Sequence, residues 1–134
     1  MRIFISGPMK NDPDHEKKFE KMEKIIKELG HSPFNPCWMK VDNNWRRHNL
    51  IAIDKAAIEQ CDAVIFMKNW EMAGGCMFEM QHAMNCNKAI LIMANDGFND
   101  GIVFNIMNSA EFNSTQIEQF SSLASAISDK LKED

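Results

Sequence analysis

The sequence predicts an α/β protein with a doubly wound parallel sheet of four or five strands and helices on both faces. Short apolar stretches alternate along the chain with longer amphipathic stretches, and this alternation is typical of such sheets. No internal repeat, low-complexity tract or linker interrupts the 134 residues, so a single domain, 1–134, is expected. In this fold class a ligand lies beyond the carboxyl ends of the strands.

The first half of the chain contains two predicted strand–helix units. Arg2–Ser6 is a buried strand, and the helix after it ends at Gly30. His31–Pro36 predicts a second strand, which its prolines shorten, and a second helix is expected over about 44–60. The apolar residues that recur at helical spacing in the first helix are Phe19, Met22, Ile26 and Leu29.

The second half begins with the clearest strand, Asp62–Met67. A loop containing Gly74-Gly75 follows, and the third helix runs from there to about Cys86. Lys88–Met93 is the next predicted strand.

The remaining residues give a weaker pattern. Residues 95–112 fit either a short strand or an irregular lid. A closing helix is expected over about Thr115–Leu131, opened by a capping box formed by Thr115 and Glu118.

Composition excludes several classes of protein. Hydrophobic residues make up 45% and charged residues 25%, and no apolar run is long enough to span a membrane. No signal-peptide pattern follows Met1, so a cytoplasmic location is expected. The net charge of −4 argues against a nucleic-acid polymer as partner.

Cofactor and metal signatures are not found. The four cysteines and four histidines show no zinc-type spacing, so we expect free thiols and no metal site. The turn after the first strand lacks the Ser/Thr-rich loop expected of a flavin-binding protein, and no cofactor is expected.

Two acids occupy positions where a core residue is expected. Asp54 interrupts the inward stripe of the second helix, and Glu79 interrupts that of the third. Burying an unpaired carboxylate costs about as much as the whole stability of a domain. Each acid is therefore paired at the edge of its stripe, protonated, or turned toward a cavity. The two stripes are Leu50, Ile53, Asp54, Ala57 and Cys61, and Cys76, Glu79, Met80, Ala83 and Met84.

Position along the chain favours the cavity. Glu79 lies one turn into a helix that begins after Gly74-Gly75, and the Ser6-Gly7-Pro8 turn follows the neighbouring strand at the same edge of the sheet. Backbone N–H groups of a glycine pair at a helix start can hold an anion. Cys76, at the same helix start, is a weaker alternative nucleophile if its pKa is lowered there.

Several segments resemble the nucleoside 2-deoxyribosyltransferase-like superfamily, in particular its small phage and bacterial branch. The resemblance covers about residues 2–93, and the segments that carry it are FISGPM, ELGHSPFNP, CDAVIFM and NWE followed by GGCMFE. It implies a flavodoxin-like (Rossmann-like) fold and an enzyme that cleaves the bond between a nucleobase and ribose or deoxyribose. It also implies a homodimer or larger homo-oligomer whose pockets borrow residues from a neighbour.

The resemblance also implies roles for individual residues. Glu79 is the expected nucleophile, and Asp54, eight residues before Asp62, orients it or holds the substrate. The remaining expected substrate-binding residues are Ser6, Gly7, Pro8, Met9, Trp70, Gly74, Gly75 and Cys76. The chemistry parallels that of a retaining glycosidase, in which a carboxylate forms a covalent glycosyl intermediate. Base stacking on Trp70, Trp45 or Phe34 competes with plain core packing.

One departure concerns phosphate recognition. Related sequences place a serine two residues before Gly75, where this chain has Ala73. Backbone N–H groups at 74–76, or Lys10, Arg46 or Arg47, would have to bind a phosphate instead. The expected activity is hydrolysis or base exchange of a nucleoside or nucleoside 5′-monophosphate, and the alternative is a nucleotide-binding module without turnover.

Overall fold

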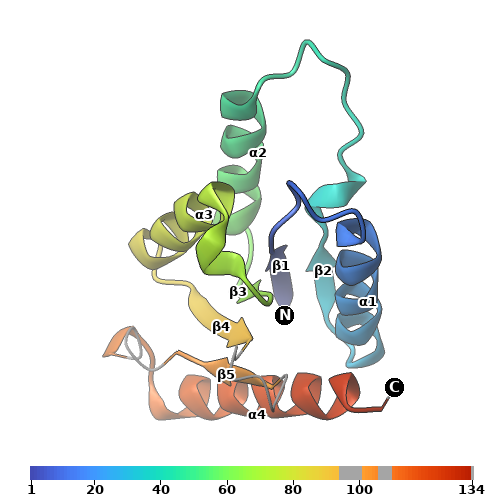
Figure 1. Ribbon diagram of the computed structural model, residues 1–134. Helices are drawn as coiled ribbons and strands as arrows, with labels where there is room; N and C mark the ends of the chain where they lie inside the picture. The colour runs from blue at the N-terminus through green and yellow to red at the C-terminus, as the bar shows by residue number, and fades with distance from the viewer. Residues whose placement is uncertain (94–100, 106–109, 134) are drawn as a thin grey trace.

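The computed structural model describes residues 1–93, 101–105 and 110–133. These residues form a five-stranded sheet of order β2-β1-β3-β4-β5 (Figure 1). The first four strands run parallel, and β5 runs antiparallel to β4. The predicted α/β sheet is therefore confirmed, with an antiparallel edge strand added. The strands are β1 Arg2–Ser6, β2 Ser32–Phe34, β3 Ala63–Phe66, β4 Ala89–Met93 and β5 Ile102–Phe104.

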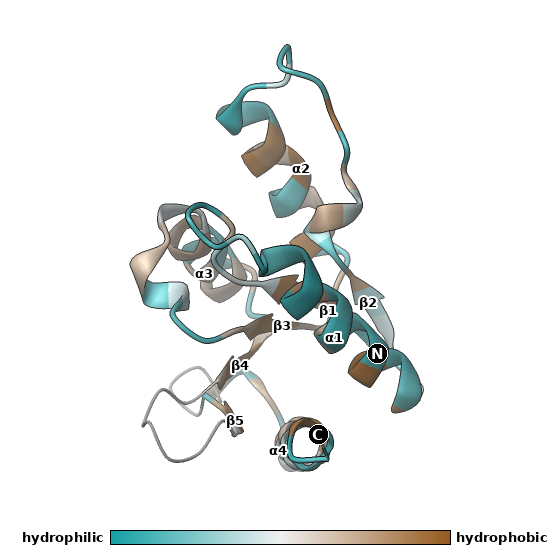
Figure 2. Ribbon diagram, turned by 45° about the vertical axis from the view of Figure 1, so that its right-hand side comes forward, coloured by the Kyte–Doolittle hydropathy of each residue, from teal (hydrophilic) through white to brown (hydrophobic). Residues whose placement is uncertain are grey.

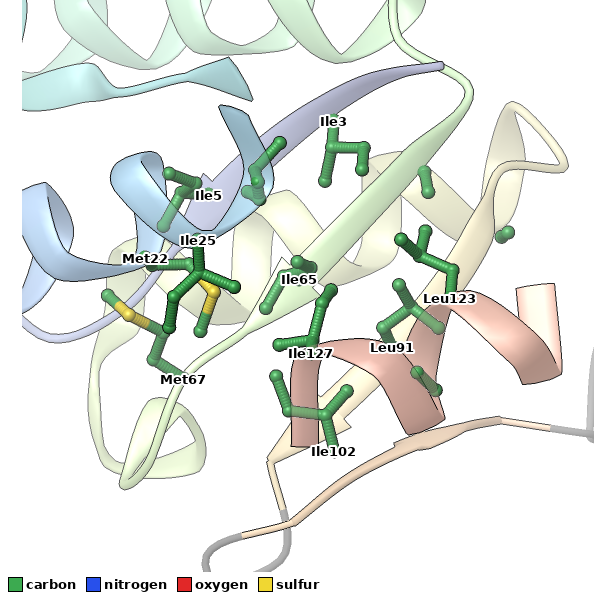
Figure 3. Close-up of a cluster of buried hydrophobic side chains, with 14 of the residues drawn as sticks. Ile3, Ile5, Met22, Ile25, Ile65, Met67, Leu91, Ile102, Leu123 and Ile127 are labelled. Atoms are coloured by element: carbon green, nitrogen blue, oxygen red, sulfur yellow. The ribbon is translucent and has the colours of Figure 1, made fainter. Parts of the chain in front are cut away.

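Two pairs of helices cover the two faces of the sheet. Successive strand residues point to opposite faces, so Ile3 and Ile5 pack with α1 and α4, whereas Phe4 packs on the side of α2 and α3. Figure 3 shows the first of these clusters, with Leu123 and Ile127 of α4 beside the strands. The helices are α1 His15–Glu28, α2 Arg47–Glu59, α3 Gly74–Asn85 and α4 Ser114–Leu131. The short 3₁₀ helices η1 Pro36–Trp38 and η2 Trp70–Met72 lie in the loops before α2 and α3.

The hydropathy of the elements matches this layering. Strands β3 and β4 are coloured hydrophobic, and much of α1 is hydrophilic (Figure 2). No helix among the described residues combines the length and the apolar character that crossing a lipid bilayer would require.

The predicted end of the first helix is confirmed. Gly30 follows α1 with φ +84°, a left-handed conformation that side chains other than glycine adopt at a cost.

Helix α2 differs from its prediction. It begins at Arg47 rather than near residue 44, because a turn over 42–45 precedes it and the Asn49 side chain accepts a hydrogen bond from the Arg46 N–H at 3.0 Å. Ile58, which the expected stripe left out, is its one fully buried residue. Leu50, Ile53 and Ala57 are only partly buried, because α2 rises away from the sheet (Figure 1).

The carboxyl-terminal helix is capped two residues earlier than expected. Asn113 and Gln116 exchange side-chain and backbone hydrogen bonds of 2.8 and 2.9 Å, so they form the capping box in place of Thr115 and Glu118. Of the ambiguous segment 95–112, residues 102–104 form β5, and residues 95–100 and 106–109 lie outside the described part of the chain.

Candidate active site

The candidate site lies where the order of the sheet reverses. From β1 the chain passes to β2 on one side and then to β3 on the other, so β1 and β3 are adjacent, and Ser6 pairs with Phe66 at their carboxyl ends. Ligands of open α/β sheets bind in the crevice outside such a switch point. The turn after β1 and the start of α3 both leave from this edge.

Ser6 and Glu79 meet at this edge, although they lie 73 positions apart in the sequence. The Ser6 hydroxyl donates a hydrogen bond of 2.8 Å to Oε1 of Glu79. Ser6 is 1% exposed and Glu79 is partly buried. The last residue of β1 therefore orients a carboxyl that projects from the second turn of α3.

Asp54 supplies the second acid from α2. Its Oδ1 is buried and has no hydrogen-bond partner among the described residues. Burial raises the pKa of Asp54 to about 6. Such an orphaned oxygen is costly in a folded protein unless water, a proton or a ligand satisfies it.

The environment of Glu79 also disfavours its charged form. Burial is the main cause that raises its pKa to about 8, the charge of Asp54 adds to it, and the hydrogen bond from Ser6 opposes it. Within the described part of the chain, neither acid forms an ion pair. Near neutral pH the pair therefore carries one proton and one negative charge.

The turn after β1 is packed too closely for a larger residue. A Cβ on Gly7 would lie 2.8 Å from Cε of Met67 and 3.4 Å from Cζ of Phe19. Gly7 therefore packs closely against Met67, just after β3, and Phe19 of α1, and a larger residue would have to displace the Met67 side chain. Pro8 is partly buried, and Met9 is 37% exposed at the rim of the turn.

The start of α3 presents two different glycines. A Cβ on Gly74 would lie 2.8 Å from Nη2 of Arg47, whereas nothing lies within 4 Å of a Cβ on Gly75. The same guanidinium lies 5.9 Å from the centroid of the Phe78 ring. Arg47, one of the residues considered for phosphate, is therefore held beside the helix start, and Gly75 faces open space.

Two expectations for α3 are wrong. Cys76 is 2% exposed, and burial raises the pKa of its thiol to about 11, so the lowered pKa suggested by its place at a helix start is wrong. Met84, expected in the inward stripe, is 45% exposed. Trp70, on η2 just before α3, packs against Phe66 with ring centroids 5.4 Å apart and stays partly exposed, so its expected contact with the substrate stays a prediction.

Among the described residues, the acid pair does not line either of two surface grooves. One, of about 590 Å³, lies between the start of β1 and α4. The other, of about 750 Å³, lies at the start of α2, beside Phe78 of α3, and includes Arg47. Sequence reasoning missed this second groove as a unit, although the run of two arginines between Trp45 and His48 is a visible signal. Its lining residues are Asn43, Trp45, Arg46, Arg47, His48, Ile51 and Phe78.

Comparison with solved structures identifies the fold. The 2-deoxyribosyltransferase of the psychrotolerant bacterium Bacillus psychrosaccharolyticus superposes with a TM-score of 0.60 at 19% identity, over 87% of this chain and 96% of that one. The CMP N-glycosidase of Clostridium botulinum gives a TM-score of 0.50 at 24% identity, over 73% and 74% of the two chains. The expected resemblance to the nucleoside 2-deoxyribosyltransferase-like superfamily is thus confirmed at the level of the fold.

Sequence comparison leads to a family without an assigned activity. No curated protein matches the chain. The family described as a domain of unknown function (DUF4406) matches residues 1–92, and the chain belongs to that family.

Proposed function

We propose that this protein cleaves the N-glycosidic bond of a nucleoside or nucleoside 5′-monophosphate, as a hydrolase or a base-exchange transferase. The observation that carries the proposal is the Glu79 carboxyl, held by Ser6 beside Asp54 at the switch point of the sheet. The fold shared with a 2-deoxyribosyltransferase and a CMP N-glycosidase supports the same reaction class.

In the proposed first step, a carboxylate oxygen of Glu79 attacks C1′ of the sugar while the bond from C1′ to the base nitrogen breaks. The electron pair of that bond passes to the base, and the carboxyl proton of Asp54 neutralises it. A covalent glycosyl-enzyme results. Water, or a second base, then attacks C1′ with Asp54 accepting its proton, and Glu79 is released.

The proton shared by the two acids suits this order of reaction steps. In the free protein the proton resides mainly on Glu79, because its pKa is the higher of the two. Positive charge that develops at C1′ stabilises the Glu79 carboxylate, so the proton moves to Asp54, where the departing base needs it. Ser6 stabilises the ionised nucleophile with its hydrogen bond to Oε1.

The start of α3 is the proposed contact for the rest of the substrate. The open space at Gly75 leaves room for the sugar or its 5′ group against backbone N–H groups. A 5′-phosphate would receive the positive charge of Arg47 in place of the hydroxyl that Ala73 lacks. This arrangement supports a monophosphate as substrate.

We also propose a homodimer or larger homo-oligomer. Four large apolar side chains on η2 and α3 are exposed, namely Met72, Met77, Phe78 and Met84. Exposed apolar side chains gathered on neighbouring elements are typical of an interface. Sedimentation of the full chain as a monomer at micromolar concentration would contradict this part of the proposal.

The activity is tested with a panel of ribo- and deoxyribonucleosides and their 5′-monophosphates. Free or exchanged base is measured by chromatography, with and without a second base as acceptor. Hydrolysis releases base without the acceptor, and transfer depends on it. We expect Glu79→Gln to lower kcat by at least about a thousandfold, and Glu20→Gln, on the exposed side of α1, to leave it unchanged.

Two results would overturn the proposal. One is no turnover of any compound in the panel, and the other is full activity in Glu79→Gln. Saturable binding of a nucleotide without product would instead favour a binding module that lacks turnover.

A further inference from the structure

Three potential metal ligands converge where α2 and α3 end. Nε2 of His82 lies 3.1 Å from Oε1 of Glu59 and 3.6 Å from Sγ of Cys86. The three ligand atoms all lie within 4.8 Å of one another. We propose that Glu59, His82 and Cys86 bind a zinc ion that joins the end of α2 to the end of α3.

The two separations measured from His82 are close to those of tetrahedral coordination. With Zn–N of about 2.0–2.1 Å, Zn–S of about 2.3 Å and Zn–O of about 2.0–2.2 Å, tetrahedral angles place nitrogen about 3.6 Å from sulfur and about 3.4 Å from oxygen. The separations at His82 are 3.6 Å to Cys86 and 3.1 Å to Glu59. His82 and Cys86 are four residues apart on one side of α3, as two ligands on one helix must be. A fourth position stays open for water.

The donor set favours zinc over the hard cations. A thiolate and an imidazole suit Zn²⁺, whereas Mg²⁺ and Ca²⁺ require several oxygen ligands. Zinc binding by Nε2 requires His82 to carry its proton on Nδ1, and Cys86 to bind as the thiolate.

The ends of the two helices add to the attraction for a cation. Glu59 is the last residue of α2, and Cys86 caps the end of α3. Both ends carry the negative pole of a helix dipole. The Lys88 ammonium donates a hydrogen bond of 3.0 Å to the Glu59 carbonyl oxygen, so a positive charge is already nearby. This ammonium repels a cation and offsets the attraction of the helix dipoles. The affinity for zinc must therefore come mainly from the thiolate and the imidazole.

Zinc at this position would fix α2 against the rest of the fold. Ile58 is the one fully buried residue of α2, so this helix has little core packing of its own. Glu59 shares α2 with Asp54, and His82 lies one turn beyond Glu79 on α3. The zinc site does not depend on the proposed reaction, and its test measures metal and stability rather than turnover.

The experiment uses the full chain, stripped with a chelator and then supplied with zinc chloride or cobalt chloride alone. We expect one zinc per chain by elemental analysis and a thiolate-to-cobalt charge-transfer band with Co²⁺. We expect Tm to rise by about 10 °C at free zinc of about 100 times Kd.

Matched variants identify the ligands. Cys86→Ser should weaken zinc binding at least about tenfold and remove the cobalt band. Cys37→Ser, which changes another half-buried thiol on η1, should keep both. Glu59→Gln, at an exposed side chain, tests the site without disturbing the core and should also weaken binding. Two results would overturn the proposal. One is less than one zinc per wild-type chain, and the other is zinc binding in Cys86→Ser and Glu59→Gln as tight as in the wild type.

Discussion

Replacing Glu79 with glutamine should stabilise the folded protein at alkaline pH. Its pKa is raised from the ordinary 4.5 to about 8 in the fold, mainly by burial. As the pH rises, the unfolded chain loses this proton first. The contribution of Glu79 to the free energy of unfolding is therefore fully present below about pH 4.5 and is lost as the pH rises to about 8. Each pH unit of this window costs about 1.4 kcal/mol, which gives an upper limit of about 5 kcal/mol. Since Glu79 is partly exposed, we expect about 2–4 kcal/mol.

The assay is urea denaturation of the wild type and Glu79→Gln at several values between about pH 5 and about pH 9. The two proteins should differ little at pH 5, and the variant should be more stable by about 2–4 kcal/mol at pH 9. This corresponds to a Tm difference of about 7–14 °C. The glutamine carbonyl can still accept the hydrogen bond from Ser6, so the comparison isolates the charge.

Glu20→Gln is the control for this comparison. It removes an exposed carboxyl from α1 and should shift stability by less than about 0.5 kcal/mol at every pH. A Glu79→Gln variant that is less stable than the wild type at pH 9 would show that the fold stabilises the carboxylate. The reasoning on burial would then be wrong.

Three further predictions follow from the site. The value of kcat/KM should be highest near pH 7 and should fall below about pH 6 and above about pH 8, because the proposed reaction needs one proton between Asp54 and Glu79. A value that keeps rising past about pH 8 would contradict this assignment. Gly7→Ala should lower the free energy of unfolding by about 1–3 kcal/mol in urea denaturation, because its Cβ meets Met67, and unchanged stability would refute the steric argument. Gly75→Ala should leave that free energy within about 0.5 kcal/mol and raise KM, and an unchanged KM would show that substrate does not occupy the open space.

The acid pair was accessible to prediction because simple rules place it. Apolar spacing assigned Glu79 and Asp54 to the inward sides of two helices. The order of strands and helices put the end of β1 and the start of α3 at the same edge of the sheet. The hydrogen bond between Ser6 and Glu79 is the direct result of these two placements.

Features that depend on tertiary packing were harder to predict. The stripe of α2 was misjudged because the helix rises from the sheet and only Ile58 reaches the core completely. The thiol pKa of Cys76 depends on how deeply the helix start is buried, which local sequence does not report. The approach of Glu59 to His82 requires the relative position of two helices, so spacing along one chain segment could not reveal it.

The two faces of the sheet differ in the size of their apolar cluster and in whether their helices carry the two acids. The face under α1 and α4 holds the larger apolar cluster, and both acids come from the helices on the opposite face. Stabilising substitutions could therefore be accumulated beneath α1 and α4 without altering either acid of the proposed site. The usual trade-off between stability and activity should therefore be weaker here than in a protein whose active site is built into its main hydrophobic core.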